Sequence, residues 1–200
     1  MIASSNKNKI AEITTILQRE TAINWQFINC PPLPEPEEPF STYLENASHK
    51  AKYYGDKANI VTLSEDSGLS IEALNHFPGV HTRDFVEQCG SIENAFKQLK
   101  EKMQSTKNYS ATFVCAAALY MPTSQMTLSY EATEQGTISF PPRGTDGFGF
   151  DPVFIPSGYE QTIAELGMDL KNRLSHRAMA IKGLLQKLQK SNYLLSTRQS

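Results

Sequence analysis

The chain has 200 residues, which is enough for one domain with a core of its own. Its formal net charge of −2 excludes the broad positive field that nucleic-acid-binding proteins carry, so an anionic ligand would be held by a few placed cations. Apolar residues make up 40% and charged residues 20%, which excludes a disordered chain, and no apolar run approaches the roughly 20 residues of a membrane span.

The N-terminus and the cysteines indicate the compartment. The chain passes straight from Met1 into patterned sequence, so no signal peptide is visible. Cys30, Cys89 and Cys115 are isolated thiols without C-x-x-C pairing, so we expect neither a disulfide framework nor a zinc site. We therefore expect a reducing, cytoplasmic compartment.

The first 39 residues predict a strand, a polar turn, a helix, a second strand and a loop. Ile2–Ser4 is a short strand, and Asn6 is expected to cap a helix whose apolar residues recur at helical spacing. A strand, a polar turn and a helix N-terminus in succession commonly present backbone N–H groups to phosphate. Ile23–Asn29 is the second predicted strand, and the proline-rich segment Pro31–Pro39 is an exposed connection.

The middle of the chain predicts a helix followed by a strand that ends in a polar turn. Thr42–Asn59 has the apolar stripe of a helix packed on one face. Ile60–Leu63 is an apolar strand, which we expect to end at the turn Glu65–Gly68 before Leu69–Ala73 continues extended.

Two helices, a pair of long strands and a last helix follow. The helices are expected around Thr82–Gln88 and Ser91–Gln104, and the strands at Tyr109–Met121 and Gln125–Ser139. The last helix is expected to begin after Ser175 as its N-cap. These elements predict an α/β fold with a mixed β-sheet flanked by helices, whose long strands project from one side.

The segment Gly147–Phe154 has the composition of a ligand pocket. Its glycines free the backbone for close approach, Phe148 and Phe150 offer ring faces, and Pro152 biases Asp151 toward an extended conformation. Taken alone, the segment is more typical of a glycine–proline turn that leads into the short strand Val153–Ile155 than of a pocket.

Four polar clusters lie at the ends of predicted elements, and their most specific motifs are Thr42–Ala47, Glu65–Leu69, Phe148–Pro152 and Lys171–Arg177. In this order and spacing they resemble the inosine/xanthosine triphosphate pyrophosphatase family, from about Ile2 to Leu188. The resemblance implies hydrolysis of the deaminated purine nucleotides ITP, dITP and XTP to the monophosphate and pyrophosphate, which cleanses the nucleotide pool. It further implies that residues 1–200 form one elongated domain with two lobes and a central active-site cleft. It also implies that the protein is a homodimer.

Hydrolysis of a phosphoanhydride needs a bridging cation, carboxylates to hold it, and a positioned water. Asp66 is the first candidate carboxylate, although an aspartate also begins many ordinary turns. Its neighbour Glu65 favours a functional role, because adjacent carboxylates repel unless a cation lies between them. By resemblance, Asp66 is the general base or a Mg²⁺ ligand, and both roles stay open. Relatives often carry Asp-Asp here, so direct metal contact by Glu65 is in doubt.

Glu45 has two interpretations. With Thr42 it forms a capping-box pattern, in which the glutamate caps its own helix. The resemblance instead implies that Glu45 is a second Mg²⁺ ligand.

Phosphate contacts are implied for the polar turn at the start of the chain and for lysines elsewhere. Ser4, Asn6 and Lys9 match the triphosphate-binding turn of the family, and Lys50 and Lys171 are weaker candidates. The complete predicted substrate-binding set includes their neighbours as well: Ser4, Ser5, Asn6, Lys7, Asn8, Lys9, Lys50, Ser67, Phe148, Gly149, Phe150, Asp151, Lys171, His176 and Arg177.

His176 and Arg177 place cations at a helix N-terminus, which opposes the helix dipole at a cost of about 0.3–1 kcal/mol. Base recognition would account for them, because arginine has only donors and the purine 6-oxo group accepts where the adenine amine does not. By resemblance, Phe148 stacks on the base, and Asp151 accepts from its N–H edge or orients Arg177. How guanine is excluded is not indicated.

Two alternatives remain beside the purine pyrophosphatase. One keeps the reaction and shifts the substrate to pyrimidine nucleotides. The other is a nucleotide-binding regulator without turnover, and the presence of Asp66, Glu45 and Lys9 argues against it.

Overall fold

The structure is a computed structural model, and it describes residues 1–21 and 34–191. One sheet has the strand order β1-β2-β3-β4-β5, with β1 (Ile2–Ala3) parallel to β2 (Thr62–Ile71). β3 (Ser110–Met121) lies between β2 and β4 (Met126–Ile138), and β4 is antiparallel to β5 (Phe154–Pro156). The predicted mixed sheet flanked by helices is confirmed.

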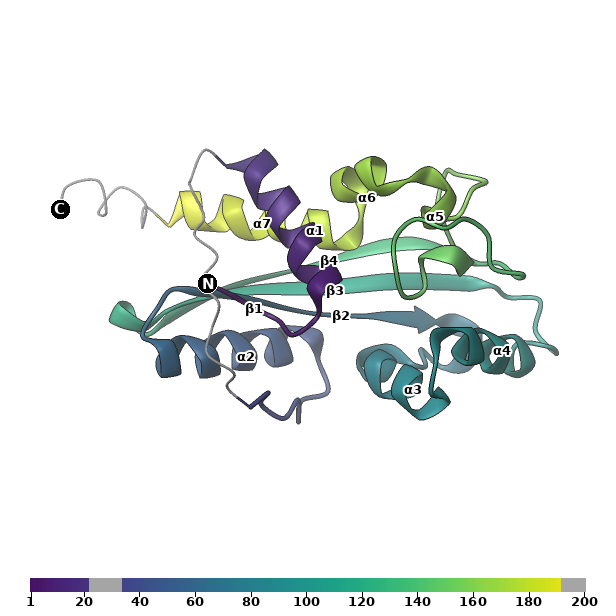
Figure 1. The fold of residues 1–200 in the computed structure, drawn as a ribbon, viewed down its shortest axis with the longest axis horizontal. Helices are drawn as coiled ribbons and strands as arrows, with labels where there is room; N and C mark the ends of the chain where they lie inside the picture. The colour runs from purple at the N-terminus through teal and green to yellow at the C-terminus, as the bar shows by residue number, and fades with distance from the viewer. Residues whose placement is uncertain (22–33, 192–200) are drawn as a thin grey trace. The chain divides into compact units, whose positions relative to one another are not determined.

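Helices precede, separate and follow these strands (Figure 1). They are α1 (Lys7–Glu20), α2 (Tyr43–Ala58), α3 (Thr82–Cys89), α4 (Ile92–Lys102), α5 (Ile163–Leu166), α6 (Met168–Leu174) and α7 (His176–Lys190). The helices expected from the sequence agree within a few residues, whereas α5 and α6 were not expected. The predicted strand Ile23–Asn29 lies outside the described residues, as does the start of the predicted proline-rich loop.

The chain divides into two compact units. Unit 1 takes the described residues of Met1–Asp66, Cys115–Ala132 and Arg177–Ser200. Unit 2 takes Ser67–Val114 and Thr133–His176. Strands β2, β3 and β4 therefore contribute residues to both units.

In unit 1, alternate residues of β3 face opposite helical layers, as the two-residue period of a strand requires. Cys115, Ala117 and Leu119 pack with residues of α1 and α7. Ala116 and Ala118 pack with residues of α2. Figure 1 shows the same division, with α1 and α7 over one face of the strands and α2 over the other. Neighbouring residues of these strands thus meet different helices.

The core of unit 2 is rich in aromatic residues. Phe113 of β3 and Phe154 of β5 lie 4.3 Å apart between ring centroids. Phe85 of α3 and Phe96 of α4 belong to the same buried cluster. Within this unit, Figure 1 shows α3 and α4 on one side of the strands and α5 and α6 on the other. The strands are therefore covered by helices here as well.

Strand β2 runs without a break through the polar segment Glu65–Gly68. The predicted strand end at Leu63 and the predicted turn at Glu65–Gly68 are therefore wrong. Glu65 and Asp66 are only 3% and 5% exposed. The strand continues because cations from neighbouring helices compensate the buried carboxylates, which the local sequence does not reveal.

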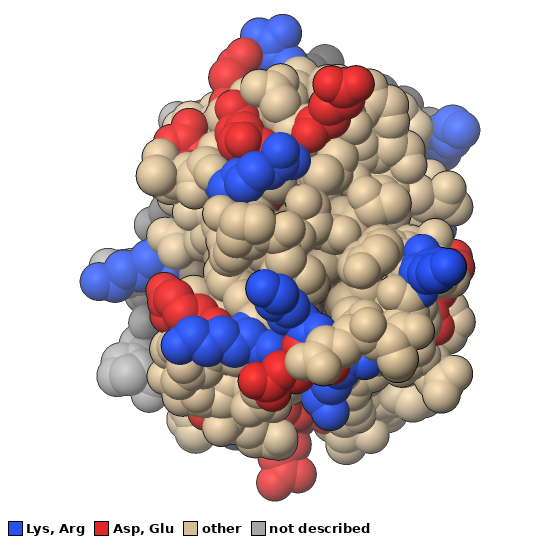
Figure 2. All heavy atoms as spheres, turned by 90° about the vertical axis from the view of Figure 1, so that its right-hand side faces the viewer, with Lys and Arg blue, Asp and Glu red and all other residues tan. Residues whose placement is uncertain are grey.

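Surface charge is mixed on the face shown in Figure 2, where lysine and arginine side chains are interspersed with aspartate and glutamate. Charges of one sign do not gather into a single patch on this face. Among residues 1–21 and 34–191, no helix is both long enough and apolar enough to cross a membrane.

Candidate active site

The polar turn after β1 is organised by its own side chains. Asn6 caps α1, since its Oδ1 accepts hydrogen bonds from the backbone N–H of Asn8 at 3.0 Å and of Lys9 at 3.2 Å. The Ser4 hydroxyl accepts from the N–H of Asn6 at 3.2 Å. Lys7 and Asn8 are exposed in the first helical turn. The predicted cap is confirmed, and it fixes the start of α1 directly after β1.

Glu65 faces the layer of α1 and α7. Its Oε1 lies 2.7 Å from Lys9 Nζ, and its Oε2 lies 3.4 Å from Arg177 Nη2 and accepts from the Cys115 thiol at 3.4 Å. Burial alone would raise the pKa of Glu65, but Lys9, Arg177 and Lys50 outweigh it and hold the pKa well below its usual range. Glu65 is therefore a carboxylate with cations of its own.

Asp66 is the next residue in β2 and meets the opposite layer, that of α2. Asn46 Nδ2 donates to Asp66 Oδ2 at 3.3 Å, and Lys50 Nζ lies 3.6 Å from Asp66 Oδ1. Burial raises the pKa of Asp66 to about 6, since the nearby carboxylates of Glu38 and Glu65 add to burial while Lys50 opposes it. A carboxylate with a pKa this close to neutrality is suited to act as a general base. Strand geometry sends Glu65 and Asp66 to opposite layers, where each has a cation beside it, and Lys50 lowers the pKa of both.

The Asp66 side of the site contains two residues that the sequence analysis missed. Glu38 forms an ion pair with Lys50, and it comes from a segment that was predicted only as an exposed connection. Asn46 holds the end of that segment, because it donates to the carbonyl of Phe40 and accepts from its N–H, both at 3.1 Å. The acidic residues between the prolines, and the place of Asn46 directly after Glu45, were the available signals.

The same segment also touches the phosphate turn, since the Ser5 hydroxyl donates to Glu35 Oε2 at 3.4 Å. Burial alone would lower the pKa of Lys50, yet Asp66, Glu38 and Glu65 raise it above its ordinary value. Lys50 is therefore a stable cation that faces carboxylates from two segments.

Glu45 is exposed, and only the N-cap half of the capping box that the sequence allowed is present, because the Glu45 carboxylate meets the Thr42 hydroxyl rather than its backbone N–H. The Thr42 hydroxyl donates to Glu45 Oε2 at 2.6 Å and accepts from the Glu45 N–H at 3.2 Å. Its role as a metal ligand stays a prediction.

Arg177 is 2% exposed, and its guanidinium pairs with carboxylates of two elements. One is Glu12 of α1, and the other is Glu65 of β2 at 3.4 Å. Burial would lower the pKa of Arg177, but the two acids outweigh it and raise the pKa. The base contact predicted for Arg177 stays a prediction, and its ion pairs give it a second role in holding Glu65.

In unit 2, Asp151 organises the glycine–phenylalanine loop. Its Oδ2 accepts from the Phe148 N–H at 2.8 Å and from Lys171 Nζ at 2.6 Å. Lys171 Nζ also lies 4.2 Å from the centroid of the Phe148 ring. Gly147 has a φ of +82°, and a Cβ there would lie 2.1 Å from Asp151 Oδ2. The glycine is therefore required for the loop to close on Asp151, which orients Phe148 and Lys171.

Phe150 packs in the core of unit 2 rather than at the surface. It is 4% exposed and meets Phe96 edge to face, with ring centroids 5.8 Å apart. The expectation that its ring offers a face to ligand is not supported by this packing, because apolar neighbours cover it. Gly149 has a φ of +62° with open space around it, and Ser67 lies within β2.

His176 begins α7, directly after Ser175 as predicted. Its ring stacks on Phe113, with centroids 4.6 Å apart and an angle of 18° between the planes. Glu134 of β4 accepts from its backbone N–H at 3.2 Å. Burial raises the pKa of Glu134 to about 7, with the hydrogen bond from His176 opposing and the charge of Asp151 adding. A carboxyl group therefore lies at the start of α7 and meets the positive end of the helix dipole.

The described residues contain no group of three metal-ligating side chains that could hold an ion by themselves. Asp66 and Glu38 nevertheless face the same Lys50 ammonium. Mg²⁺ is commonly held by one or two carboxylates together with substrate phosphates and water. The residues present thus fit a Mg²⁺ ion that binds with its phosphate ligand.

Comparison with known proteins identifies relatives over nearly the full length. The sequence model of the Ham1 family matches residues 1–187. A protein of Bdellovibrio bacteriovorus named dITP/XTP pyrophosphatase is 40% identical over 196 residues, which are 96% of this chain and 98% of the relative. One of Aquifex aeolicus with the same name is 34% identical, covering 94% of this chain and 95% of the relative.

Solved structures show the same fold. A HAM1 protein from Coxiella burnetii has a TM-score of 0.82 and 31% identity, covering 94% of this chain and 97% of the other. The Ham1 protein of Staphylococcus aureus has a TM-score of 0.80 and 31% identity, covering 96% and 97%.

Proposed function

Because the chain belongs to the Ham1 family, we propose that it is a nucleoside triphosphate pyrophosphatase for deaminated purine nucleotides. Its substrates are ITP, dITP and XTP, and its products are the nucleoside monophosphate and pyrophosphate. The observation that supports this most directly is the buried Asp66, whose pKa is raised to about 6 beside Asn46 and Lys50.

Asp66 acts as the general base in this proposal. It accepts a proton from water, the water oxygen bonds to the α-phosphorus, and the bond from that phosphorus to the bridging oxygen breaks. Pyrophosphate leaves with the electron pair of the broken bond. Asn46 and Lys50 hold the two oxygens of Asp66, so the base is positioned before the substrate arrives.

Mg²⁺ is the proposed cofactor, and when bound it would neutralise phosphate charge. Asp66 and Glu38 are the carboxylates whose placement fits it best, because both lie at Lys50. Glu45 remains the ligand that the family resemblance proposes. Its exposed carboxylate is shared with the Thr42 hydroxyl, so ligation there would weaken the helix cap.

The triphosphate is assigned to Lys9, Lys50 and the turn Ser4–Asn8. Both lysines already face carboxylates, Lys9 with Glu65 and Lys50 with Glu38 and Asp66. A triphosphate would compete with those carboxylates for the ammonium groups.

The base is assigned to Phe148, Asp151, Lys171 and His176, together with Arg177. Phe148 offers the ring for stacking, and the ion pair between Asp151 and Lys171 fixes the loop that carries it. The Arg177 guanidinium supplies donors for a 6-oxo group, which adenine lacks. The same proposal includes that the protein is a homodimer in solution and that it acts in the cytoplasm.

A pyrophosphate-release assay on a panel of nucleotides with Mg²⁺ tests this function. We expect far faster hydrolysis of ITP and XTP than of ATP, GTP or the pyrimidine triphosphates. Equal rates on ATP and ITP, or release of orthophosphate, would contradict it. Preference for a pyrimidine nucleotide would support the alternative substrate, and binding without turnover would indicate a regulator.

A further inference from the structure

Glu134 is a half-buried acid in β4 that the proposed chemistry leaves without a role. Its Oε2 accepts from the backbone N–H of His176 at 3.2 Å and lies 3.3 Å from Nδ1 of the same residue's ring. The two side chains are 12% and 5% exposed. One carboxylate oxygen therefore holds both the backbone and the ring of the residue that begins α7.

The His176 ring is constrained from a second direction as well. It stacks on Phe113 of β3 at a centroid distance of 4.6 Å, nearly parallel to that ring. Stacking fixes the plane of the imidazole but leaves it free to turn within the plane. The hydrogen bond at Nδ1 removes that freedom and determines which ring nitrogen faces the carboxyl group.

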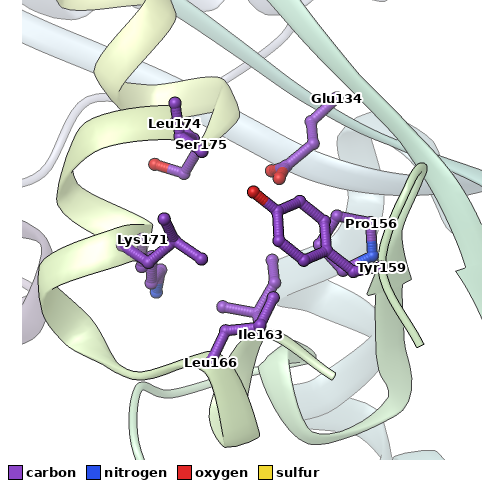
Figure 3. A pocket seen from close by; sticks show the side chains of 9 residues that line it. Glu134, Pro156, Tyr159, Ile163, Leu166, Lys171, Leu174 and Ser175 are labelled. Atoms are coloured by element: carbon purple, nitrogen blue, oxygen red, sulfur yellow. The ribbon is translucent and has the colours of Figure 1, made fainter. Parts of the chain in front are cut away.

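Glu134 also borders a cavity of about 20 Å³, which is about the room that one water molecule needs. Figure 3 shows the carboxylate of Glu134 and the hydroxyl of Tyr159 pointing toward one another, with Ser175 beside them. Lys171, whose ammonium binds Asp151, lines the same cavity. The acid thus lies within the group of residues that carries the proposed base site in unit 2.

We propose that Glu134 is a positioning residue of the nucleotide site, which holds the His176 ring and the start of α7 in the orientation that binds the nucleotide. The inference rests on the proposed function, in which His176 contacts the substrate. In its ionised form, a carboxylate at this position also interacts favourably with the positive end of the α7 dipole.

Steady-state kinetics with ITP on three variants of the full chain test the role. Glu134→Ser is too short to reach the His176 ring, whereas Glu134→Gln can still hydrogen-bond to Nδ1. Glu131→Ser removes an exposed acid of the same strand and serves as the matched control. We expect Glu134→Ser to raise KM about tenfold, the equivalent of one hydrogen bond to a charged group, with kcat changed by less than about threefold. Glu134→Gln and Glu131→Ser should keep KM within about twofold of the wild type.

A second measurement needs no substrate. The ¹H–¹⁵N NMR spectrum of the histidine ring nitrogens shows which nitrogen of His176 carries the proton, with assignment through His176→Asn. We expect Glu134→Ser to change the His176 signals and Glu131→Ser to leave them unaltered. Should Glu134→Ser fail to fold, Glu134→Asn takes its place in both measurements.

A folded Glu134→Ser variant with wild-type KM and unchanged His176 signals would overturn the proposal, even if its melting temperature were lower. That pattern would show that Glu134 only stabilises the helix start. If the wild type hydrolysed none of the nucleotides, the proposed function would fail, and unchanged ring signals would separately refute the positioning role.

Discussion

Asp66 is buried, and its ion pair with Lys50 only partly offsets the effect of burial on its pKa, which determines its expected pH behaviour. Asp66→Asn should lower kcat at least about 10²-fold with a smaller change in KM, because the lysines proposed to bind the triphosphate remain. In the wild type, kcat/KM should fall as the pH drops below about 6, where Asp66 takes up a proton and can no longer accept one from water. Near-normal turnover of the variant would show that Asp66 is only structural.

The same substitution should raise stability. Because the pKa of Asp66 is raised to about 6, the folded protein binds this proton more tightly than the unfolded chain does. Ionised Asp66 therefore costs stability above about pH 6, and a neutral asparagine removes a cost of up to about 3 kcal/mol. Urea unfolding at neutral pH measures the difference, and a lower unfolding free energy for the variant would contradict the argument.

Glu38 and Glu45 are rival candidates for the second carboxylate that holds Mg²⁺. We expect Glu38→Gln to raise the Mg²⁺ concentration needed for half-maximal activity, because Glu38 lies with Asp66 at Lys50. Glu45→Gln should chiefly weaken the start of α2 by about 0.3–1 kcal/mol, because it removes a negative charge that the helix dipole favours in the first turn while Thr42 still caps the helix. Mg²⁺ titrations and thermal unfolding of both variants decide between them, and the reverse pattern would favour Glu45 as the ligand.

Arg177 supports the fold and is also expected to recognise the base, and two substitutions separate the roles. Arg177→Ala leaves Glu12 and Glu65 buried without their cation, so it should destabilise the protein by about 3–5 kcal/mol. Arg177→Lys keeps a cation but loses the planar fork. If Arg177 contacts the 6-oxo group, the lysine variant should lose ITP-over-ATP selectivity by about ten- to a hundred-fold. Equal loss on both substrates would show that Arg177 only holds the acids.

At the level of the helix, replacing Gly183 of α7 by alanine should lower stability, which is the opposite of the usual effect in helices. Glycine to alanine within a helix usually stabilises by about 1 kcal/mol. A Cβ at Gly183 would lie 2.3 Å from Cδ1 of the Tyr130 ring in β4, so we expect Gly183→Ala to be destabilising. In a Tyr130→Ala background, which lacks the ring, adding Gly183→Ala should raise the free energy of unfolding as it usually does in a helix. A stabilised single variant would refute the packing argument.

Sequence patterns predicted the elements best where apolar spacing is regular, as in α1, α2 and β3. The prediction was wrong at Glu65–Gly68, where polar residues suggested a turn but β2 continues. Those residues stay in the strand because Lys9, Lys50 and Arg177 approach from three helices, which is long-range information. Glu134 was missed for the same reason, since its partner His176 lies far away in the sequence, and Glu38 was missed because its segment was expected to be an exposed connection.

At the scale of the whole molecule, the structure adds a physical reason to expect the homodimer that the family resemblance implies. Long paired strands would expose an apolar edge if they stood alone, but β3 is buried between helices over most of its length. The exposed edge belongs instead to β4, which pairs with β5 only through Gly136–Ile138. Within the described parts of the chain, residues 126–134 have a strand neighbour on the β3 side alone.

An unpaired strand edge is a site where a second chain can add, so natural proteins cover or blunt it. Tyr130 lies on this stretch and is 37% exposed, which leaves an aromatic ring at the surface. We therefore expect a homodimer, with a mass by light scattering of twice the chain mass of 22.3 kDa at micromolar protein. If β4 takes part, placing proline at Thr127 should convert the dimer to a monomer, since proline removes a ladder donor. A monomeric wild type at that concentration would refute the dimer, and a proline variant that stays dimeric would place the interface elsewhere.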